Sequence, residues 1–240
     1  MTSSRETAAP AERVDGRSER WREHRQQRRE QLVDAALQAV AEYGPEVSME
    51  QIAAAAGTAK PKLYRHFADR AELVEAIGAR VAESVLMRLA SAFNPRASFR
   101  TGLRNGLDAY LGYVEANPDV VRFLMNNATS SDGTSNAIVD NARTIARLFV
   151  ALATADLEAA HVPTGDAEPL AHTLVGAVLG ATDWWMLQDP AARMPRARLV
   201  DQLTVIIIGA AEAALVQWNV ALDAEAPGFF GGLTALVDRS

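Results

Sequence analysis

The sequence contains no cysteine, which excludes disulfide bonds, thiolate metal sites and cysteine nucleophiles. No apolar run is long enough to span a bilayer, and the closest, 203–216, is interrupted by Thr204 and Glu212. The first twenty residues lack the apolar segment of a secretory signal. We therefore expect a cytoplasmic protein without a membrane contact.

Signatures of the common enzyme classes are also missing. The sequence has no phosphate-binding loop, no dinucleotide-binding fingerprint and no G-x-S-x-G motif. Its four histidines, His24, His66, His161 and His172, include no pair four residues apart on a helix, so they do not suggest a metal site. We predict no catalytic residue, no metal and no cofactor.

Lysine is nearly absent, because the chain has only Lys60 and Lys62 against 22 arginines. Both lie in the stretch GTAKPKLYRHF, residues 57–67, together with Arg65 and no acidic residue. The net charge of -6 argues against a nucleic-acid partner, but the whole deficit falls in residues 81–240. Since salt screens charges beyond about 10 Å, a phosphate backbone responds to the local basic stretch rather than to the total.

Helical periodicity dominates, and we predict no β strand. The polar N-terminal residues 1–17 lack apolar periodicity and are expected to be a disordered arm. Helices are expected over residues 18–43, 48–57, 58–67, 69–90, 97–116, 119–127, 135–160, 167–188 and 196–222, with a short turn at 231–237. The predicted fold class is all-α.

The second and third predicted helices are short and joined by a tight turn with a glycine, which is the layout of a helix-turn-helix. In this layout the second helix enters the major groove and the first braces against the DNA backbone. Lys60 and Lys62 could reach phosphates or guanine edges, and Tyr64 and His66 could donate to phosphate oxygens.

Leu63 and Phe67 lie four residues apart and are expected on the core side of the same helix, which turns the polar side chains outward together. The short residues Gly57 and Ala59 would let the backbone approach DNA. A solvated charged helix face with no DNA partner is the alternative.

Together with its flanking helices, this block resembles the TetR family of one-component bacterial repressors. The likeness covers about Arg25 to Val85. The residues that carry it are Leu32, Ala35, Ala36, Gly44, Ser48, Ile52, Ala53, Ala56, Gly57, Leu63, Tyr64, His66, Phe67, Asp69 and Leu73. The resemblance implies a helix-turn-helix DNA-binding domain at residues 18–68, and a helical ligand-binding and dimerisation domain at residues 69–240. One departure is Ala59, where the family often has Ser or Thr.

Motif and resemblance together assign one set of residues to a double-stranded DNA operator. The set is Ser48, Thr58, Ala59, Lys60, Pro61, Lys62, Tyr64, Arg65, His66, Arg25 and Arg28. By the likeness, Ser48 would bind a phosphate at a helix N-terminus. The arginines between Arg20 and Arg29 would clamp phosphates or reach the minor groove, unless that helix is merely solvated.

The last two long helices carry apolar residues on more than one side. This indicates that one side packs inside its own domain and another against a partner. Family members dimerise through these helices as a four-helix bundle, so the resemblance implies a homodimer on a palindromic operator. The predicted interface residues are Leu174, Val178, Trp185, Leu203, Ile207, Ala210 and Ala214.

The middle helices mix large apolar groups, glycines and a few polar groups, which suits either core packing or a ligand pocket. Because the family carries an effector site here, we predict a pocket. Its expected residues are Gly106, Tyr110, Tyr113, Phe123, Leu124, Asn126, Phe149, Thr173, Ala177, Asp183 and Trp184.

The abundance of apolar residues favours a hydrophobic effector such as a fatty acid or long-chain acyl-CoA. Asp183 and Asp108 are the acids that would instead suit a cationic aromatic drug. A DNA-binding protein without effector, and a module that binds another protein through its apolar helices, are the remaining alternatives. The expected protein is a repressor associated with the nucleoid.

Overall fold

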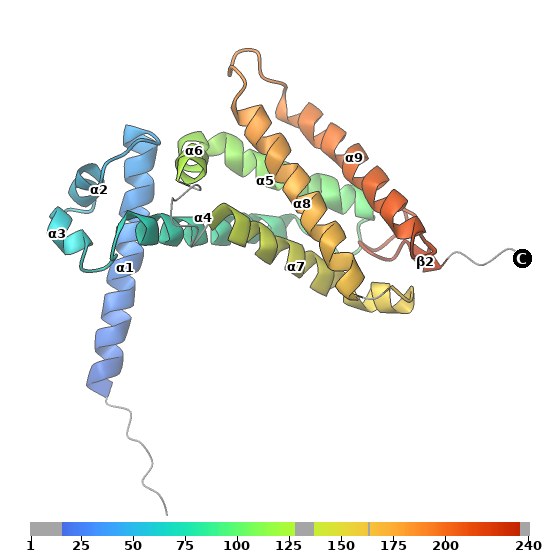
Figure 1. Ribbon diagram of the computed structural model, residues 1–240, viewed down its shortest axis with the longest axis horizontal. Coiled ribbons are helices and arrows are strands. Elements are labelled where there is room, and N and C mark those ends of the chain that lie inside the picture. The colour runs from blue at the N-terminus through green and yellow to red at the C-terminus, as the bar shows by residue number, and fades with distance from the viewer. Residues whose placement is uncertain (1–15, 128–136, 163, 236–240) are drawn as a thin grey trace, which may run out of the picture.

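The computed structural model describes residues 16–127, 137–162 and 164–235, and this part of the chain is all-α apart from one small hairpin (Figure 1). The helices are α1 (Gly16–Tyr43), α2 (Met49–Ala55), α3 (Lys60–Leu63), α4 (Arg70–Ala92), α5 (Phe99–Ala116), α6 (Pro118–Asn126), α7 (Ala137–Ala159), α8 (Thr164–Met186) and α9 (Arg196–Val216). The predicted fold class is confirmed. The expected disordered arm lies outside the described residues, except that Gly16 and Arg17 already belong to α1.

Two short strands correct the expectation that the chain has none. β1 (Val220–Leu222) pairs antiparallel with β2 (Leu233–Ala235), with Ala221 opposite Thr234. The helix predicted to run to residue 222 ends at Val216, because the chain turns through Asn219, whose φ is 58°. Asparagine tolerates this left-handed conformation better than most residues, so it ends the helix and frees the next three residues to pair.

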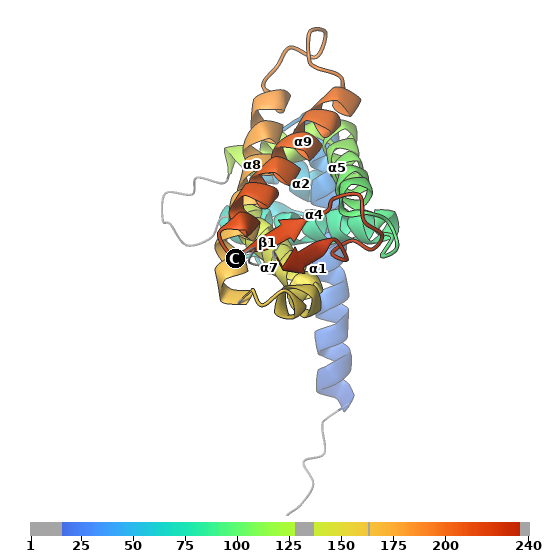
Figure 2. The ribbon, with the colours of Figure 1, turned by 90° about the vertical axis from the view of Figure 1, so that its right-hand side faces the viewer.

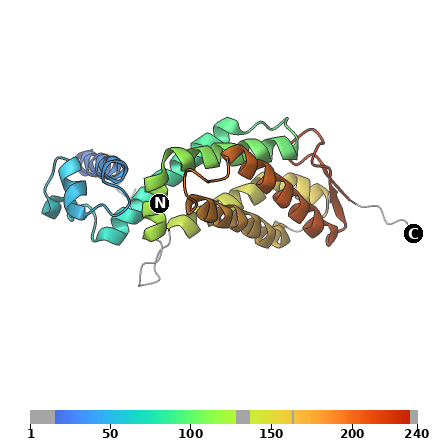
Figure 3. The same ribbon diagram turned by 90° about the horizontal axis from the view of Figure 1, so that it is seen from above.

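The N-terminal head consists of α1, α2 and α3 and lies at one end of an elongated molecule (Figure 3). Leu32 of α1, Ile52 of α2 and Leu63 of α3 are almost fully buried and pack in one cluster. The same cluster includes Phe123 of α6, so the core of the head continues without a break into the first helices of the body.

The body is formed by α4 to α9, and α4 links it to the head (Figure 1). Within the body α5 packs against α4 on one side and α9 on the other, and α7 packs against α8. Seen from the far end of the body, α8 and α9 lie side by side in front of α5 (Figure 2).

In the described part of the chain, α9 alone has the length and apolar composition of a membrane span. In its most apolar window 44% of the residues are buried inside the protein, and a single helix of this kind is weak evidence for a membrane. Val200 and Leu203 of α9 belong to the cluster formed with Leu107 of α5 and Trp185 of α8.

Candidate nucleic-acid interface

Backbone and side-chain caps fix both ends of α2. The Ser48 hydroxyl accepts a hydrogen bond from the Gln51 amide at 3.2 Å, and the Gln51 side chain accepts one from the Ser48 amide at 2.8 Å. This reciprocal pair is a capping box, as the sequence predicted. At the other end, Gly57 has a φ of 59° and Thr58 donates to the Ala53 carbonyl, which is a Schellman ending that turns the chain sharply into α3.

Helix α3 is shorter than predicted. Its α-helical part is Lys60–Leu63, and turns carry the chain on to Phe67, whose amide donates to the Leu63 carbonyl. Ala59 at the N-cap offers no side-chain hydrogen bond, and Pro61 occupies the first turn, where its missing N–H has no intrahelical partner.

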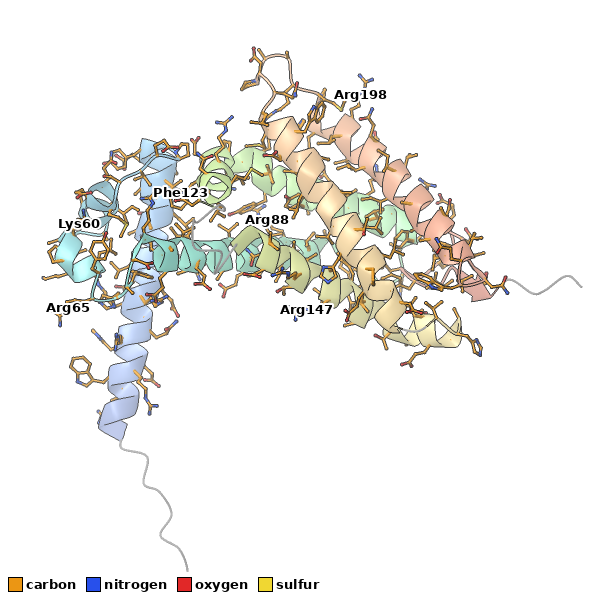
Figure 4. The ribbon with its side chains drawn as sticks, in the orientation of Figure 1. Lys60, Arg65, Arg88, Phe123, Arg147 and Arg198 are labelled. Carbon is orange, nitrogen blue, oxygen red and sulfur yellow. The ribbon has the colours of Figure 1, made fainter. Side chains whose placement is uncertain are left out.

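The two sides of this segment differ as expected from the spacing of its residues. Leu63 and Phe67 are both 0% exposed. The polar side is open, and its exposed residues are Lys60, Pro61, Lys62, Tyr64 and Arg65. Figure 4 shows Lys60 and Arg65 at the outer end of the head, away from the body. The segment therefore presents a basic tip on a rigidly buried base.

An acid from the preceding helix meets this basic tip. The ammonium nitrogen of Lys60 lies 2.5 Å from a carboxylate oxygen of Glu50 in α2. The hydrogen bond between them lowers the pKa of Glu50 and raises that of Lys60, so both stay charged at neutral pH. The acid-free stretch 57–67 is thus partly neutralised by a residue that lies outside it in the sequence.

Arg29 fixes the direction of α1 relative to the rest of the head. Its guanidinium donates to the Glu72 carboxylate at 2.7 Å and to the His66 carbonyl at 2.6 Å, and it lies 4.3 Å from the ring centroid of Phe67. Glu72 also accepts from the Ala68 amide at 2.6 Å. These contacts join α1, the end of the α3 segment and the start of α4.

His66 lies among arginines. Partial burial lowers the pKa of its imidazole, and the positive charges of Arg25, Arg28, Arg65 and Arg29 lower it further. The imidazole is therefore neutral at pH 7. The four arginines place positive charge beside the recognition segment, in a chain whose net charge is negative.

All residues predicted to bind DNA lie in the head. Arg25 is exposed on α1, and Arg28 is half-buried and donates to Gln31 at 3.1 Å. Ser48 is half-buried and its hydroxyl already serves the capping box, while its position at the start of α2 is the one expected for a phosphate contact.

The residues predicted to line a ligand pocket do not form one cluster. Tyr113, Phe123 and Leu124 belong to the core shared by the head and α6, and Tyr110 packs between that core and the core of α5, α8 and α9. Gly106 faces Leu89, with 3.7 Å between a Cβ built at Gly106 and the Leu89 methyl. These five residues are the interior part of the predicted set.

The α8 members of the same set lie elsewhere. Thr173, Ala177, Asp183 and Trp184 are exposed. Phe149 is half-buried on α7. Asn126 is exposed and donates to the carboxylate of Glu46 in the loop before α2, 2.9 Å away. No three His, Asp or Glu side chains within the described ranges lie close enough together to hold a metal ion.

The predicted dimer set needs correction, because three of its seven residues are buried in the core of their own protomer. Trp185, Leu203 and Ile207 are 0%, 4% and 4% exposed and pack in the core of α5, α8 and α9. The indole N–H of Trp185 donates to the Met194 carbonyl at 2.7 Å, which ties α8 to the loop before α9. Leu174, Val178 and Ala214 are half-buried, and Ala210 is exposed.

The apolar residues that do face outward lie one or two positions away in the sequence. They are Trp184 on α8, Leu187 directly after α8, and Val205, Ile206 and Val216 on α9. Gly176, Gly180 and Gly209 have nothing within 4 Å of an added Cβ, so another helix could approach closely there. Sequence periodicity showed that both helices are apolar on more than one side, but not which side of each is exposed.

Two of the arginines that the sequence analysis assigned to phosphates, Arg22 and Arg29, lie beside the recognition segment. Arg22 and Arg29 line a hollow with Arg25 and the end of the α3 segment. Positions 22, 25 and 29 are three and four residues apart on one helix face, so the spacing of these arginines carried the signal.

These features define a helix-turn-helix protein with a basic recognition segment and a separate helical body. Comparisons with known proteins agree. Residues 32–77 match the family of bacterial regulatory proteins, tetR family, and residues 88–221 match the tetracyclin repressor-like C-terminal domain. The chain belongs to the TetR family of transcriptional regulators.

Relatives include an uncharacterized HTH-type transcriptional regulator of Mycobacterium tuberculosis, 35% identical over 195 residues that make up 81% of each chain. The HTH-type transcriptional activator FasR of Mycolicibacterium smegmatis is 30% identical over 104 residues, 43% of this chain and 48% of FasR.

Solved structures share the fold. A TetR-family regulator from Streptomyces coelicolor superposes with a TM-score of 0.61 at 24% identity, covering 80% of this chain and 83% of its own. The fatty acid degradation regulator FadR from Bacillus halodurans gives a TM-score of 0.60 at 17% identity, covering 75% of this chain and 97% of its own.

Proposed function

We propose that this regulator represses transcription by binding a palindromic operator as a homodimer, and that a small apolar effector releases it. The observation that supports DNA binding is that the recognition segment has a buried apolar side and an exposed basic side. Leu63 and Phe67 are buried in the head, while Lys60, Lys62 and Arg65 project from the opposite side. A recognition helix held in this way presents its basic residues to the major groove without further rearrangement. Such a regulator acts on the chromosome in the bacterial cytoplasm.

The double variant Lys60→Ala/Lys62→Ala tests this assignment. Both side chains are exposed, so the substitution is expected to leave folding and oligomeric state unchanged and to abolish operator binding in a fluorescence anisotropy assay. Arg147→Gln on α7, in the body (Figure 4), is a control that removes one exposed positive charge outside the head. Operator affinity equal to that of the unaltered protein in the lysine variant would refute the assignment. Footprinting on genomic DNA supplies the operator.

The exposed sides of α8 and α9 support the dimer. Side chains as large as Trp184 and Ile206 are about half or more exposed and lie on neighbouring helices. Large apolar side chains exposed on two neighbouring helices favour an interaction site there. Family members form homodimers, and a two-fold dimer carries two recognition segments, which fits a palindromic operator. We therefore place the interface on these exposed residues and not on Trp185, Leu203 and Ile207.

The buried polar groups of the body support an apolar effector. Among the described residues the buried polar side chains are Thr182 and Thr204, and their hydroxyls donate to the Val178 and Val200 carbonyls at 2.7 Å. Tyr110 adds a hydrogen bond to Thr182, and burial raises the pKa of its hydroxyl. An interior with its polar groups already paired favours acyl chains over hydrogen-bonding ligands.

The acids that would have served a cationic drug lie outside this interior. Asp183 is exposed, and Asp108 pairs with the Arg196 guanidinium at 3.1 Å. A thermal-shift panel separates the two effector classes. Fatty acids and acyl-CoAs are expected to stabilise the protein, by about 2.7 kcal/mol at a hundredfold excess over Kd, while cationic dyes leave it unchanged. Stabilisation by the dyes alone would favour the multidrug type, and stabilisation by neither would favour an effector-independent regulator.

A route from the body to the head lies at the end of α6. Arg70, at the start of α4, donates to the Asn127 side chain at 3.2 Å and to the Val47 carbonyl at 3.0 Å. It also lies 5.4 Å from the ring centroid of Phe123. An effector that displaces α6 would therefore move the loop before α2 as well as α4, and with them the recognition segment. To release DNA, the effector must favour the displaced state by a few kcal/mol.

The direction of regulation is testable in vitro. FasR is an activator, and it aligns with less than half of this chain. Transcription from a template that carries the footprinted operator is expected to fall when the regulator is added and to recover with the effector. Stimulation by the regulator alone would show an activator.

A further inference from the structure

Helix α1 extends well beyond the core of the head. Its first residue in that core is Leu32, whereas the helix begins at Gly16. The preceding residues 20–27 are all exposed, and Figure 1 shows this end of α1 projecting past α3 and α4. At 1.5 Å per residue, the twelve residues 16–27 form an arm about 18 Å long.

A hollow lies between this arm and the end of the α3 segment. It encloses about 860 Å³ and is named here the arm groove. Its main lining residues are Arg22, Arg25 and Arg29 from α1, and Tyr64, Arg65 and His66 from the recognition segment. Because Tyr64 and Arg65 also belong to the exposed recognition side, the groove continues directly from the predicted major-groove contact.

The arm groove has a net positive charge, which comes mainly from the α1 wall, and Arg65 adds a positive charge on the opposite wall. Its lining contains four arginines and two acids, Glu23 and Glu72. Glu72 is engaged by Arg29 and by the Ala68 amide. The lowered pKa of His66, which burial and the neighbouring arginines cause, agrees with a positive potential inside the groove.

The groove is also preformed. Arg29 ties the base of the arm to Glu72 and to the His66 carbonyl, so the helical arm has a fixed direction relative to the recognition segment. A preformed charged surface loses little conformational entropy on binding. The rise per base pair along DNA is about 3.4 Å, so an arm of about 18 Å spans roughly five base pairs.

We propose that the arm groove binds the phosphate backbone of the DNA that flanks the major-groove contact, so that each head covers about five base pairs more than its recognition segment reaches. This inference rests on the proposed operator binding and adds a second contact region to it. The ligand chemistry is a run of phosphodiesters rather than a base sequence. The arm therefore adds affinity and salt dependence without adding base specificity.

The test compares the unaltered regulator with the variant Arg22→Gln/Arg25→Gln on its footprinted operator. Phosphates along the operator are replaced one at a time by neutral methylphosphonates, and Kd is measured by anisotropy over a salt series. For the unaltered protein, neutral phosphates in the flank are expected to weaken binding. For the variant, neutral phosphates at these positions no longer change Kd. The slope of log K against log salt flattens by about two per head.

The charge-matched control is Arg143→Gln/Arg147→Gln on α7, where both residues are exposed and lie on the body. It is expected to keep the phosphate profile and the salt slope. Thermal melting of both double variants checks that the fold is intact.

The outcomes separate this inference from the proposed function. If the Lys60→Ala/Lys62→Ala variant loses operator binding while the arm variant keeps the full phosphate profile and salt slope, the arm groove is not a DNA site although the operator assignment stands. If the lysine variant binds like the unaltered protein, the operator assignment itself fails. Loss of the flank positions in the arm variant alone supports the inference.

Discussion

The Lys60 ammonium and the Glu50 carboxylate form an ion pair across the helix-turn-helix, with 43% and 63% of their side chains exposed. Exposed pairs of this kind contribute little to stability. The larger consequence concerns DNA, because Glu50 places a negative charge beside the residue assigned to phosphates or bases. The free regulator therefore holds one of its two lysines partly neutralised.

We predict that Glu50→Gln binds DNA more tightly than the unaltered protein. The amide can still accept a hydrogen bond from Lys60, but the repulsion between Glu50 and phosphate is gone. Affinity for operator and for unrelated duplexes is expected to rise about tenfold at low salt, with a salt slope steeper by about one. Anisotropy titrations measure both. Glu158→Gln on α7 removes the same charge from an exposed site on the body and should have no effect.

Operator affinity should depend on pH through His66. The pKa of its imidazole is lowered in the free protein, so the group is neutral at pH 7. A phosphate nearby favours the protonated form and raises the pKa, so binding takes up a proton. Affinity is therefore expected to rise as the pH falls from 8 to 6, by up to about tenfold per pH unit and per head.

His66→Gln should flatten this pH profile while keeping part of the affinity. His172→Gln, on α8 of the body, should keep the profile of the unaltered protein. A profile that is the same in all three proteins would show that His66 does not meet phosphate.

Arg29 is expected to stabilise the head more than other charged residues on its surface. Arg29→Leu removes the side-chain donor to the His66 carbonyl and the ion-pair partner of Glu72, which keeps the Ala68 amide, and this should cost about 1–3 kcal/mol. Arg80→Leu breaks an exposed pair with Asp34 and should cost about 1 kcal/mol or less. Urea denaturation followed by circular dichroism compares the two.

The difference in stability between the unaltered protein and Arg29→Leu should also depend on pH. The pKa of Glu72 is lowered in the folded protein by the Ala68 amide and by Arg29, so this stabilisation is present at neutral pH and is lost as the pH falls through the folded-state pKa. The gap between the unaltered protein and Arg29→Leu is therefore expected to narrow from pH 7 to pH 4. A constant gap would argue that the contact with Phe67, not the ion pair, is what Arg29 contributes.

The head could be predicted from sequence because its signals are local. Ser48 and Gln51 form their capping box within one turn. Helix α2 ends where the Gly57 amide donates to the Ala54 carbonyl and the Thr58 amide donates to the Ala53 carbonyl. Leu63 and Phe67 then place the polar side by spacing alone. The Glu50 partner of Lys60 was missed, since the two lie ten residues apart and meet only after the turn has formed.

The body was harder to predict because its helices are apolar on more than one side. Periodicity identifies an apolar helix, but it does not say which apolar side meets its own domain and which is free. The strands were missed for a related reason, since β1 and β2 are three residues each and pair across ten intervening residues. Short strands of this kind are defined by their partner and not by their own sequence.

Trp184 and Trp185 give the sharpest test of the dimer interface proposed on α8 and α9, because they are adjacent in the sequence but differ in exposure. Trp184 is 49% exposed and Trp185 is 0% exposed. If α8 and α9 form the dimer interface through their exposed sides, Trp184→Asp should yield a folded monomer, seen by sedimentation equilibrium, that binds the palindromic operator much more weakly. Ile206→Asp on α9 should do the same.

Trp185→Ala removes an indole packed against its own core and bonded to the Met194 carbonyl, so it should cost about 3–5 kcal/mol of stability. Whatever fraction of that variant stays folded should still dimerise. A dimer that survives Trp184→Asp and Ile206→Asp together would place the interface on another surface.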